Sequence, residues 1–238
     1  MITNARLGAE WKETKAIKEL EPETEVTIYD WTYFWKRLKS SKGVHCLTRR
    51  SSARRSAFMK CMLDKLPTLE ELNRRRPDIY TTAECQVCQS RVKETQEHLA
   101  SCKGQANLWK RIQKVSIATA WKSLKEEEKI RVPPYVLYMA LFGQTEQEEI
   151  KIRKALIKGL IPKAIQDKLL QILNTKTRQQ FTNIVAETTW NTFYEQVWRI
   201  RCEKVNTWER EKGITSREKK RKIKKKGRSR KKEKGKAS

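Results

Sequence analysis

The stretch Cys85-Gln-Val-Cys88, followed after nine residues by His98-Leu-Ala-Ser-Cys102, decides how this chain folds locally. Two intervening residues allow a turn to bring the thiolates of Cys85 and Cys88 together. Three intervening residues place His98 and Cys102 on one face of a helix. The two pairs therefore supply four side chains that are able to converge on one point.

Three thiolates and one imidazole are the ligand types that zinc prefers, and four ligands complete its tetrahedron. The pattern predicts bound Zn²⁺ with Cys85, Cys88, His98 and Cys102 as ligands. The role is structural, because a filled tetrahedron leaves no position for a reactive water. Such a site contributes folding free energy on the order of 10 kcal/mol. The alternatives are four unrelated side chains or a site that has lost its metal.

The formal net charge of the 238-residue chain is +26, and it is unevenly distributed. Residues 213–238 hold 14 Lys or Arg against two Glu, and residues 36–76 hold 13 against three acidic residues. Such blocks favour a polyanion, because each neutralised phosphate releases counterions. The tail lacks the apolar face of a membrane-surface helix, and no segment approaches the roughly 20 apolar residues of a membrane span. We therefore expect RNA or DNA as a partner and no membrane.

The first basic block is expected to contact the phosphate backbone rather than base edges, since no aromatic residues alternate with its cations. The predicted contact residues are Arg49, Arg50, Arg54, Arg55, Lys60, Arg74, Arg75 and Arg76. The alternative is a face that only solubilises the protein.

The second basic block contains runs typical of nuclear import signals. They consist of Lys219, Lys220, Arg221, Lys222, Lys224, Lys225 and Lys226. The sequence predicts a nuclear protein, with a merely adhesive polycationic tail as the alternative.

Apolar periodicity and capping residues predict a mainly α-helical protein with a small Cys-Cys-His-Cys zinc knuckle. The expected helices cover residues 51–65, 68–75, 107–129, 135–142, 146–158, 163–174 and 179–212, and Gly213 is expected to cap the last one. Four regions follow from this pattern: a polar lead-in (1–30), the zinc-binding region (31–110), a helical domain (111–212) and a disordered basic tail (213–238).

The first 15 residues contain no apolar run, so no secretory signal is expected. The six cysteines are accordingly expected to be thiols or metal ligands rather than disulfides. Cys61 lies on an apolar helical stripe and is expected to be a buried thiol. His45 and Cys46 are expected to pack or to lie exposed rather than to form a second metal site.

Several motifs occur in order between residues 31 and 110. They are Trp31, Trp35, Leu66-Pro67-Thr68, Leu72, Arg75, Cys85, Cys88, Glu94-Thr95, His98-Leu99, Cys102 and Trp109. This order resembles the zinc-binding region that follows the polymerase in non-LTR (LINE-like) retrotransposon reverse transcriptases. A later run resembles the ends of retroelement-derived proteins of fungi; it comprises Val197-Trp198-Arg199, Cys202-Glu203, Trp208-Glu209 and Gly213-Ile214.

The resemblance implies a region that helps a reverse transcriptase to bind template RNA or target DNA. The polymerase itself is not expected here, because two-metal chemistry needs paired carboxylates and the chain has no Asp-Asp pair. The acidic run Glu126–Glu128 is expected to be a solvated surface. We therefore expect no enzyme, with a nuclear protein-interaction module or a non-functional retroelement remnant as alternatives to nucleic-acid binding.

Overall fold

The computed structural model describes residues 28–39, 49–88, 90–143 and 145–221. Across these residues the chain is mainly helical, which confirms the mainly α-helical prediction. The lead-in to residue 27 and the tail from residue 222 lie outside the described residues, and so do His45 and Cys46. In the described residues no helix is both long and apolar enough to cross a membrane.

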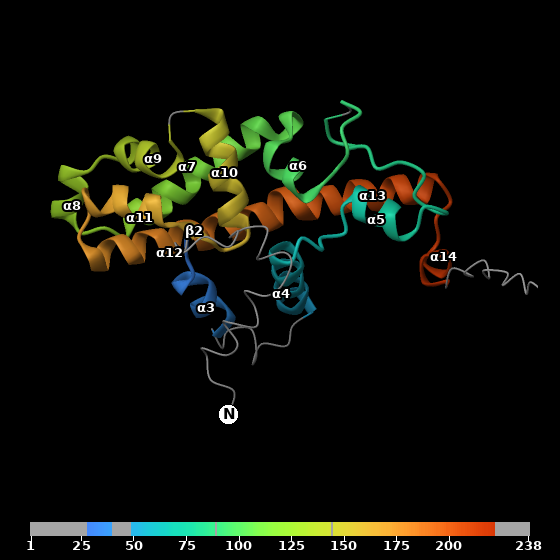
Figure 1. The fold of residues 1–238 in the computed structure, drawn as a ribbon, viewed down its shortest axis with the longest axis horizontal. Helices are drawn as coiled ribbons and strands as arrows, with labels where there is room; N and C mark the ends of the chain where they lie inside the picture. Colours follow the sequence, from blue (N-terminus) through green and yellow to red (C-terminus); the bar gives the residue numbers. More distant parts are fainter. Residues whose placement is uncertain (1–27, 40–48, 89, 144, 222–238) are drawn as a thin grey trace, which may run out of the picture.

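A long helical rod forms the spine of the molecule. Helix α12 (Thr175–Thr192) continues through the π-helical segment η3 (Phe193–Trp198) into α13 (Arg199–Glu211). At 1.5 Å per residue the rod is about 55 Å long, and it runs along the longest axis of the structure (Figure 1).

Helix α7 (Ala106–Lys122) lies antiparallel to the rod. Near its start Trp109 stacks on Phe193, with ring centroids 5.7 Å apart, and further along Ser116 shares a 2.9 Å hydrogen bond with Thr189. Residue numbers therefore increase along α7 in the direction in which they decrease along the rod. This pairing places the residues just before α7, which include the predicted metal ligands, beside the start of α13.

Two clusters of apolar side chains form the core. One joins α3 (Thr32–Lys39) and α4 (Arg49–Met62) to α7 and the rod through Phe34, Phe58 and Trp190. The same cluster contains side chains from before and after residue 110. The boundary expected at residue 110 stays a prediction, and the two sides share this core.

The second cluster lies between α7, α12 and a set of shorter elements. These elements are α8 (Glu126–Arg131), α9 (Pro134–Phe142), α10 (Glu146–Ile157) and α11 (Lys163–Leu170). A short antiparallel pairing of β1 (Tyr29–Asp30) with β2 (Ile161–Pro162) completes the bundle.

Several helices begin or end where the capping residues in the sequence predict. Helix α5 (Leu69–Arg75) begins after Thr68, whose hydroxyl accepts a hydrogen bond from the Glu71 amide. Gly213 follows α13 with φ of +70°, the left-handed conformation that glycine adopts at least cost. The sequence predicted these two helix ends because a cap depends only on residues that are close to it in the chain.

Other boundaries were wrong. Helix α4 covers Arg49–Met62, whereas residues 51–65 were expected. The expected helix 107–129 is two helices, since α7 ends at Lys122 and α8 begins at Glu126. Glu128 is buried rather than solvated, because its carboxylate caps α8 by accepting from the Lys125 amide.

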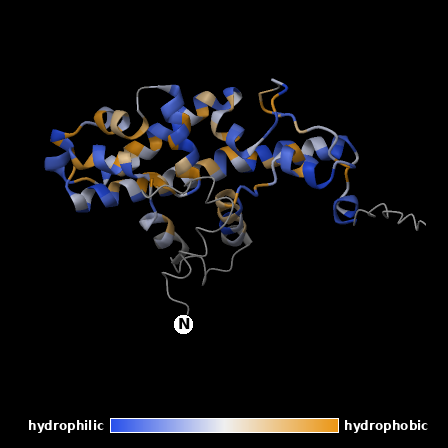
Figure 2. Cartoon of the chain, viewed as in Figure 1, coloured by the Kyte–Doolittle hydropathy of each residue, from blue (hydrophilic) through white to orange (hydrophobic). Residues whose placement is uncertain are grey.

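Residues 213–221 were expected to be disordered, yet α14 (Ser216–Lys220) forms there. The hydroxyl of Thr215 accepts from the Glu218 amide while the Glu218 carboxylate accepts from the Thr215 amide, a capping box that stabilises the first turn. Figure 2 shows α14 as hydrophilic throughout, which explains why an apolar pattern did not reveal it.

Candidate metal centre

Two short pieces of structure carry the four expected ligands. Cys85 and Cys88 lie in a hairpin-like segment, residues 83–94, in which the Cys85 amide donates to Val92 and the Glu94 amide to Ala83. His98 lies in the first turn of α6 (Gln96–Ser101), and Cys102 follows its last residue. Thr95 caps α6 by accepting from the His98 amide at 2.9 Å.

The four ligand atoms converge. The sulfur and imidazole nitrogen atoms of Cys85, Cys88, His98 and Cys102 all lie within 4.8 Å of one another. The Sγ atoms of Cys85 and Cys102 are 4.0 Å apart, twice the length of about 2.05 Å for a disulfide. His98 Nε2 lies 3.4 Å from Cys88 Sγ. The sequence prediction that these residues form one metal-capable cluster is confirmed.

Local hydrogen bonds favour the thiolate form of Cys85, whereas the hydrogen bond shared with Cys85 and burial raise the pKa of Cys102. The Cys102 side chain and the amides of Cys88 and Val87 direct donors at Cys85, and together they lower the pKa of Cys85 to about 4. The Val87 amide lies 3.4 Å from the Cys85 sulfur. Cys85 and Cys102 are both buried, whereas Cys88 and His98 are partly exposed on the outer side.

Gly104 permits the hairpin to approach the start of α7. A Cβ atom at this position would lie 3.1 Å from the Cys88 Cα and 3.1 Å from the Val87 carbonyl oxygen. Both neighbours are backbone atoms of the ligand-bearing turn, so they have no side-chain rotation by which to yield. The glycine therefore sets the distance between the Cys85–Cys88 turn and Cys102.

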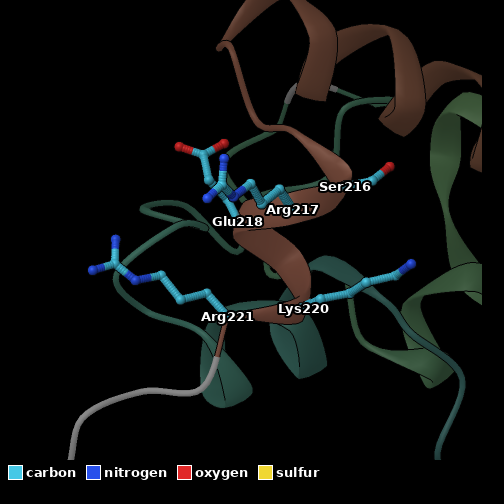
Figure 3. Close-up of a pocket in the computed structure, with 5 residues that line it drawn as sticks. All are labelled: Ser216, Arg217, Glu218, Lys220 and Arg221. Atoms are coloured by element: carbon cyan, nitrogen blue, oxygen red, sulfur yellow. The ribbon is translucent and has the colours of Figure 1, made fainter.

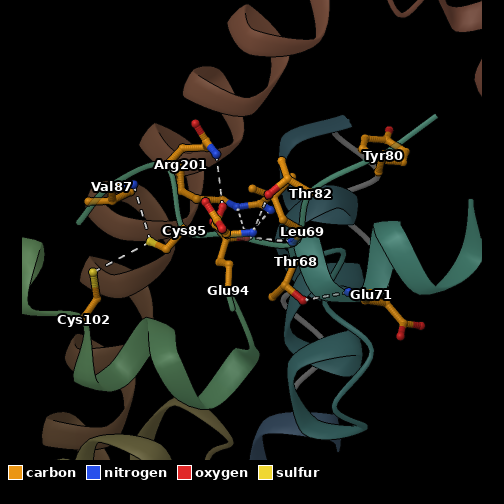
Figure 4. A network of polar contacts seen from close by, with 12 residues as sticks. Thr68, Leu69, Glu71, Tyr80, Thr82, Cys85, Val87, Glu94, Cys102 and Arg201 are labelled. Carbon is orange, nitrogen blue, oxygen red and sulfur yellow. Dashed lines mark hydrogen bonds and ion pairs between the residues drawn. The ribbon is translucent and has the colours of Figure 1, made fainter. Parts of the chain in front are cut away.

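A buried ion pair connects the metal-binding segment with the rod (Figure 4). Arg201 of α13 donates to Glu94 through Nε, at 2.9 Å, and through Nη2. The same carboxylate oxygen accepts from the Leu69 amide at 2.9 Å, at the start of α5. The guanidinium of Arg201 also lies over the ring of Trp198. The side chains of Glu94 and Arg201 are 0% and 3% exposed.

No family model matches this chain. No curated protein and no solved structure matches it either. The resemblance to the zinc-binding region of retrotransposon reverse transcriptases consequently rests on the sequence motifs, and it stays a prediction.

Most of the predicted phosphate-contacting arginines have partners within the protein. Arg54 pairs with Glu195 and lies over the Tyr194 ring, and Arg74 and Arg75 both pair with Glu71. Arg55 and Lys60 are exposed on α4 without a described ion pair. Arg49 and Arg50 belong to α4, but their side chains lie outside the described residues.

Arg76 has a structural contact that the sequence did not suggest. Its Nη1 donates to the carbonyl oxygens of Glu218, Lys219 and Arg221 at 2.9 to 3.1 Å, while its Nε and Nη2 bind Asp78. These carbonyls are at the end of α14, where few backbone acceptors have helical partners, and that of Glu218 also accepts from the Arg221 amide. Arg76 therefore attaches the first turn of the basic tail to the segment after α5.

Of the seven residues of the expected nuclear import signal, the structure describes only Lys219, Lys220 and Arg221. Lys219 pairs with Glu209 of α13, and Lys220 and Arg221 are exposed. A hollow beside α14 is lined by Ser216, Arg217, Glu218, Lys220 and Arg221. In Figure 3 these side chains spread outward in different directions, so they do not converge on a ligand. Lys222, Lys224, Lys225 and Lys226 lie outside the described residues.

Sequence reasoning missed a set of cations that begins beside the metal-binding segment and continues along α7. They are Lys103, just after the last ligand, and Lys110, Arg111, Lys114 and Lys122 on α7, and all five are exposed. The signal was present, because α7 contains four basic residues and no acidic one. It was overlooked because the two longer basic blocks dominate the net charge.

Proposed function

We propose that the chain binds one Zn²⁺ through Cys85, Cys88, His98 and Cys102 in a structural role. Tetrahedral zinc, with bonds of about 2.3 Å to sulfur and about 2.0 Å to nitrogen, requires sulfur–sulfur separations of about 3.8 Å and sulfur–nitrogen separations of about 3.5 Å. The corresponding distances here are 4.0 and 3.4 Å. Hard cations such as Mg²⁺ and Ca²⁺ prefer oxygen ligands, so this donor set favours zinc.

In this proposal the chain is a nucleic-acid-binding accessory region, derived from a non-LTR retrotransposon reverse transcriptase, without a catalytic core of its own. It contacts the phosphate backbone of RNA or DNA in the nucleus. The observation that carries the proposal is a metal-capable Cys₃His cluster whose neighbouring cations have no carboxylate partner among the described residues. Unpaired cations on a rigid element are available to phosphates at no cost of breaking an internal ion pair.

A salt titration of binding tests the proposal. The full chain would be mixed with labelled single- and double-stranded RNA and DNA of unrelated sequences, at 50 to 200 mM salt. We expect affinity for all of them to fall by on the order of 10³-fold over that range, the effect of several released counterions. Affinity that does not change with salt, or no binding at low salt, would contradict the proposal.

The second candidate is a nuclear protein-interaction module. It is favoured by apolar side chains exposed at the end of the bundle remote from the metal ligands, where Ile130 is 86% and Tyr135 is 69% exposed. A chain ending at Arg221 retains every described contact and separates the two functions. If this shorter chain loses all affinity for nucleic acid, the folded part is not the binder and the second candidate is favoured.

A further inference from the structure

One face of α7 carries closely spaced positive charge. We define the α7 basic face as Lys110, Arg111, Lys114 and Lys122. At 100° per residue these four positions fall within an arc of about 120°. All four are exposed, and no carboxylate lies on the helix to neutralise them.

The opposite side of the same helix is fixed in the core. Trp109, Ile112, Ser116 and Ala120 are fully buried. The Trp109 indole donates to the Leu99 carbonyl of α6 at 2.9 Å, and the Gln113 amide oxygen accepts from Arg153 of α10 at 3.1 Å. The basic face is therefore presented by a helix that does not have to become ordered on binding, which lowers the entropic cost of a complex.

The α7 basic face also differs from the first basic block, residues 36–76, in that its cations form no described ion pairs with carboxylates. Arg54, Arg74 and Arg75 each have a carboxylate partner, whereas no described ion pair includes Lys110, Arg111, Lys114 or Lys122. Binding a phosphate at a paired arginine must compete with the existing carboxylate. The unpaired face is for this reason the better acceptor for a polyanion.

The metal-binding segment extends this positive surface. Arg91 and Lys93 are exposed on the hairpin, and Lys103 is exposed directly after Cys102. Of the nearby acidic residues, Glu94 is paired with Arg201 and Glu97 with Lys154, while Glu84 is exposed opposite Lys93 on the hairpin. Because Gly104 packs against the Cys88 backbone, a metal that fixes Cys88 and Cys102 also fixes Lys103 relative to α7.

We propose that the α7 basic face, continued by Lys103, is the surface on which this protein binds the phosphodiester backbone of RNA or DNA. The inference rests on the proposed nucleic-acid-binding function and assigns it to a site outside the two basic blocks. From Lys110 to Lys122 the helix rises about 18 Å, the length of about five phosphates along one strand. The geometry suits backbone contact without base recognition, since Trp121, which lies within this arc, is half-buried, donates to the Val132 carbonyl and has Lys129 over its ring.

A matched pair of triple variants of the full chain tests the assignment. The face variant is K110Q/R111Q/K114Q, and the control is K151Q/K168Q/K176Q, which removes the same charge from exposed positions on α10, α11 and α12. Glutamine is a good helix former, so both should fold. At 0.1 M salt we expect the face variant to bind single-stranded RNA and DNA about 10²-fold more weakly than the control. The slope of log affinity against log salt should fall by about 2 to 3.

Lysine acylation of the unmodified protein provides an independent readout that does not depend on variants. Bound nucleic acid should protect Lys110, Lys114 and Lys122 from an acylating reagent and leave Lys151 and Lys168 reactive.

Equal affinity of the face and control variants, with equal acylation of both lysine sets, would overturn the assignment while leaving the proposed function intact. Absence of any nucleic-acid binding by the unmodified chain would contradict both the assignment and the proposed function. Equally tight binding of poly-glutamate would assign the face to an acidic protein instead.

Discussion

Arg201 and Glu94 form an ion pair that is almost completely buried, across 107 residues of sequence. The pair connects the rod with the segment that carries the metal ligands, and Glu94 also accepts from the start of α5. Removing one partner of such a pair leaves an uncompensated buried charge. Arg201 and Glu94 therefore determine whether the metal-binding segment stays attached to the rest of the fold.

Replacing Arg201 with methionine tests this dependence. We expect R201M to lower the free energy of unfolding by about 3 to 5 kcal/mol, measured by urea denaturation. R199M is the control, because Arg199 is exposed and its ion pair with Glu195, one helical turn away, contributes much less than a buried pair. The double variant E94Q/R201M should be less destabilised than the sum of its single variants. Equal effects of R201M and R199M would contradict the role given to the buried pair.

Substitution of Gly104 should weaken zinc binding more than it lowers the stability of the fold. A Cβ at Gly104 meets the Cys88 backbone at 3.1 Å, so G104A should displace the ligand turn and weaken zinc affinity about tenfold or more in a chelator competition. G213A provides the comparison, because Gly213 also needs its flexibility but has open space around it. It should cost about 1 kcal/mol of stability through its positive φ and leave zinc affinity unchanged. Unchanged zinc affinity in G104A would show that the close approach is unimportant.

The Cys61 thiol should be inert in the folded protein. Its side chain is fully buried, and burial raises its pKa well above the ordinary thiol value. Since the thiolate is the reactive form, iodoacetamide at pH 8 should modify Cys61 in guanidinium and not in native protein, as read by mass spectrometry. Raising the pH to 9 should not change this, because the folded pKa lies higher still. Rapid modification of native Cys61 would show that this part of the core opens.

Arg76 should keep α14 attached to the body of the protein. R76Q removes the donors to the Glu218, Lys219 and Arg221 carbonyls, so trypsin should cleave after Lys219 and Lys220 about tenfold faster. R75Q removes a neighbouring arginine that pairs only locally, with Glu71, and should not change this rate. Equal cleavage of both variants would argue that Arg76 is a free surface cation.

The sequence predicted those features that depend on near neighbours. The metal cluster, the Thr68 cap and the Gly213 terminus were all encoded within about 20 residues. The contacts that join distant segments, such as Arg201 with Glu94 and Arg76 with α14, leave no local pattern and were not predicted. Net charge identified basic blocks but not which cations were already paired, and pairing is a tertiary property. The α7 basic face was missed although its four cations lie within one helix, because the two longer basic blocks dominate the net charge.

The central claim is that one zinc ion orders the segment from Cys85 to Cys102, and the zinc-to-protein ratio of reduced, purified protein tests it most directly. We predict one zinc per chain for the unmodified protein. For C88S we predict a ratio well below one, with residues 84–103 losing local order because one of four ligands is gone. An unmodified protein without zinc, or a C88S variant that retains a full equivalent, would contradict the account.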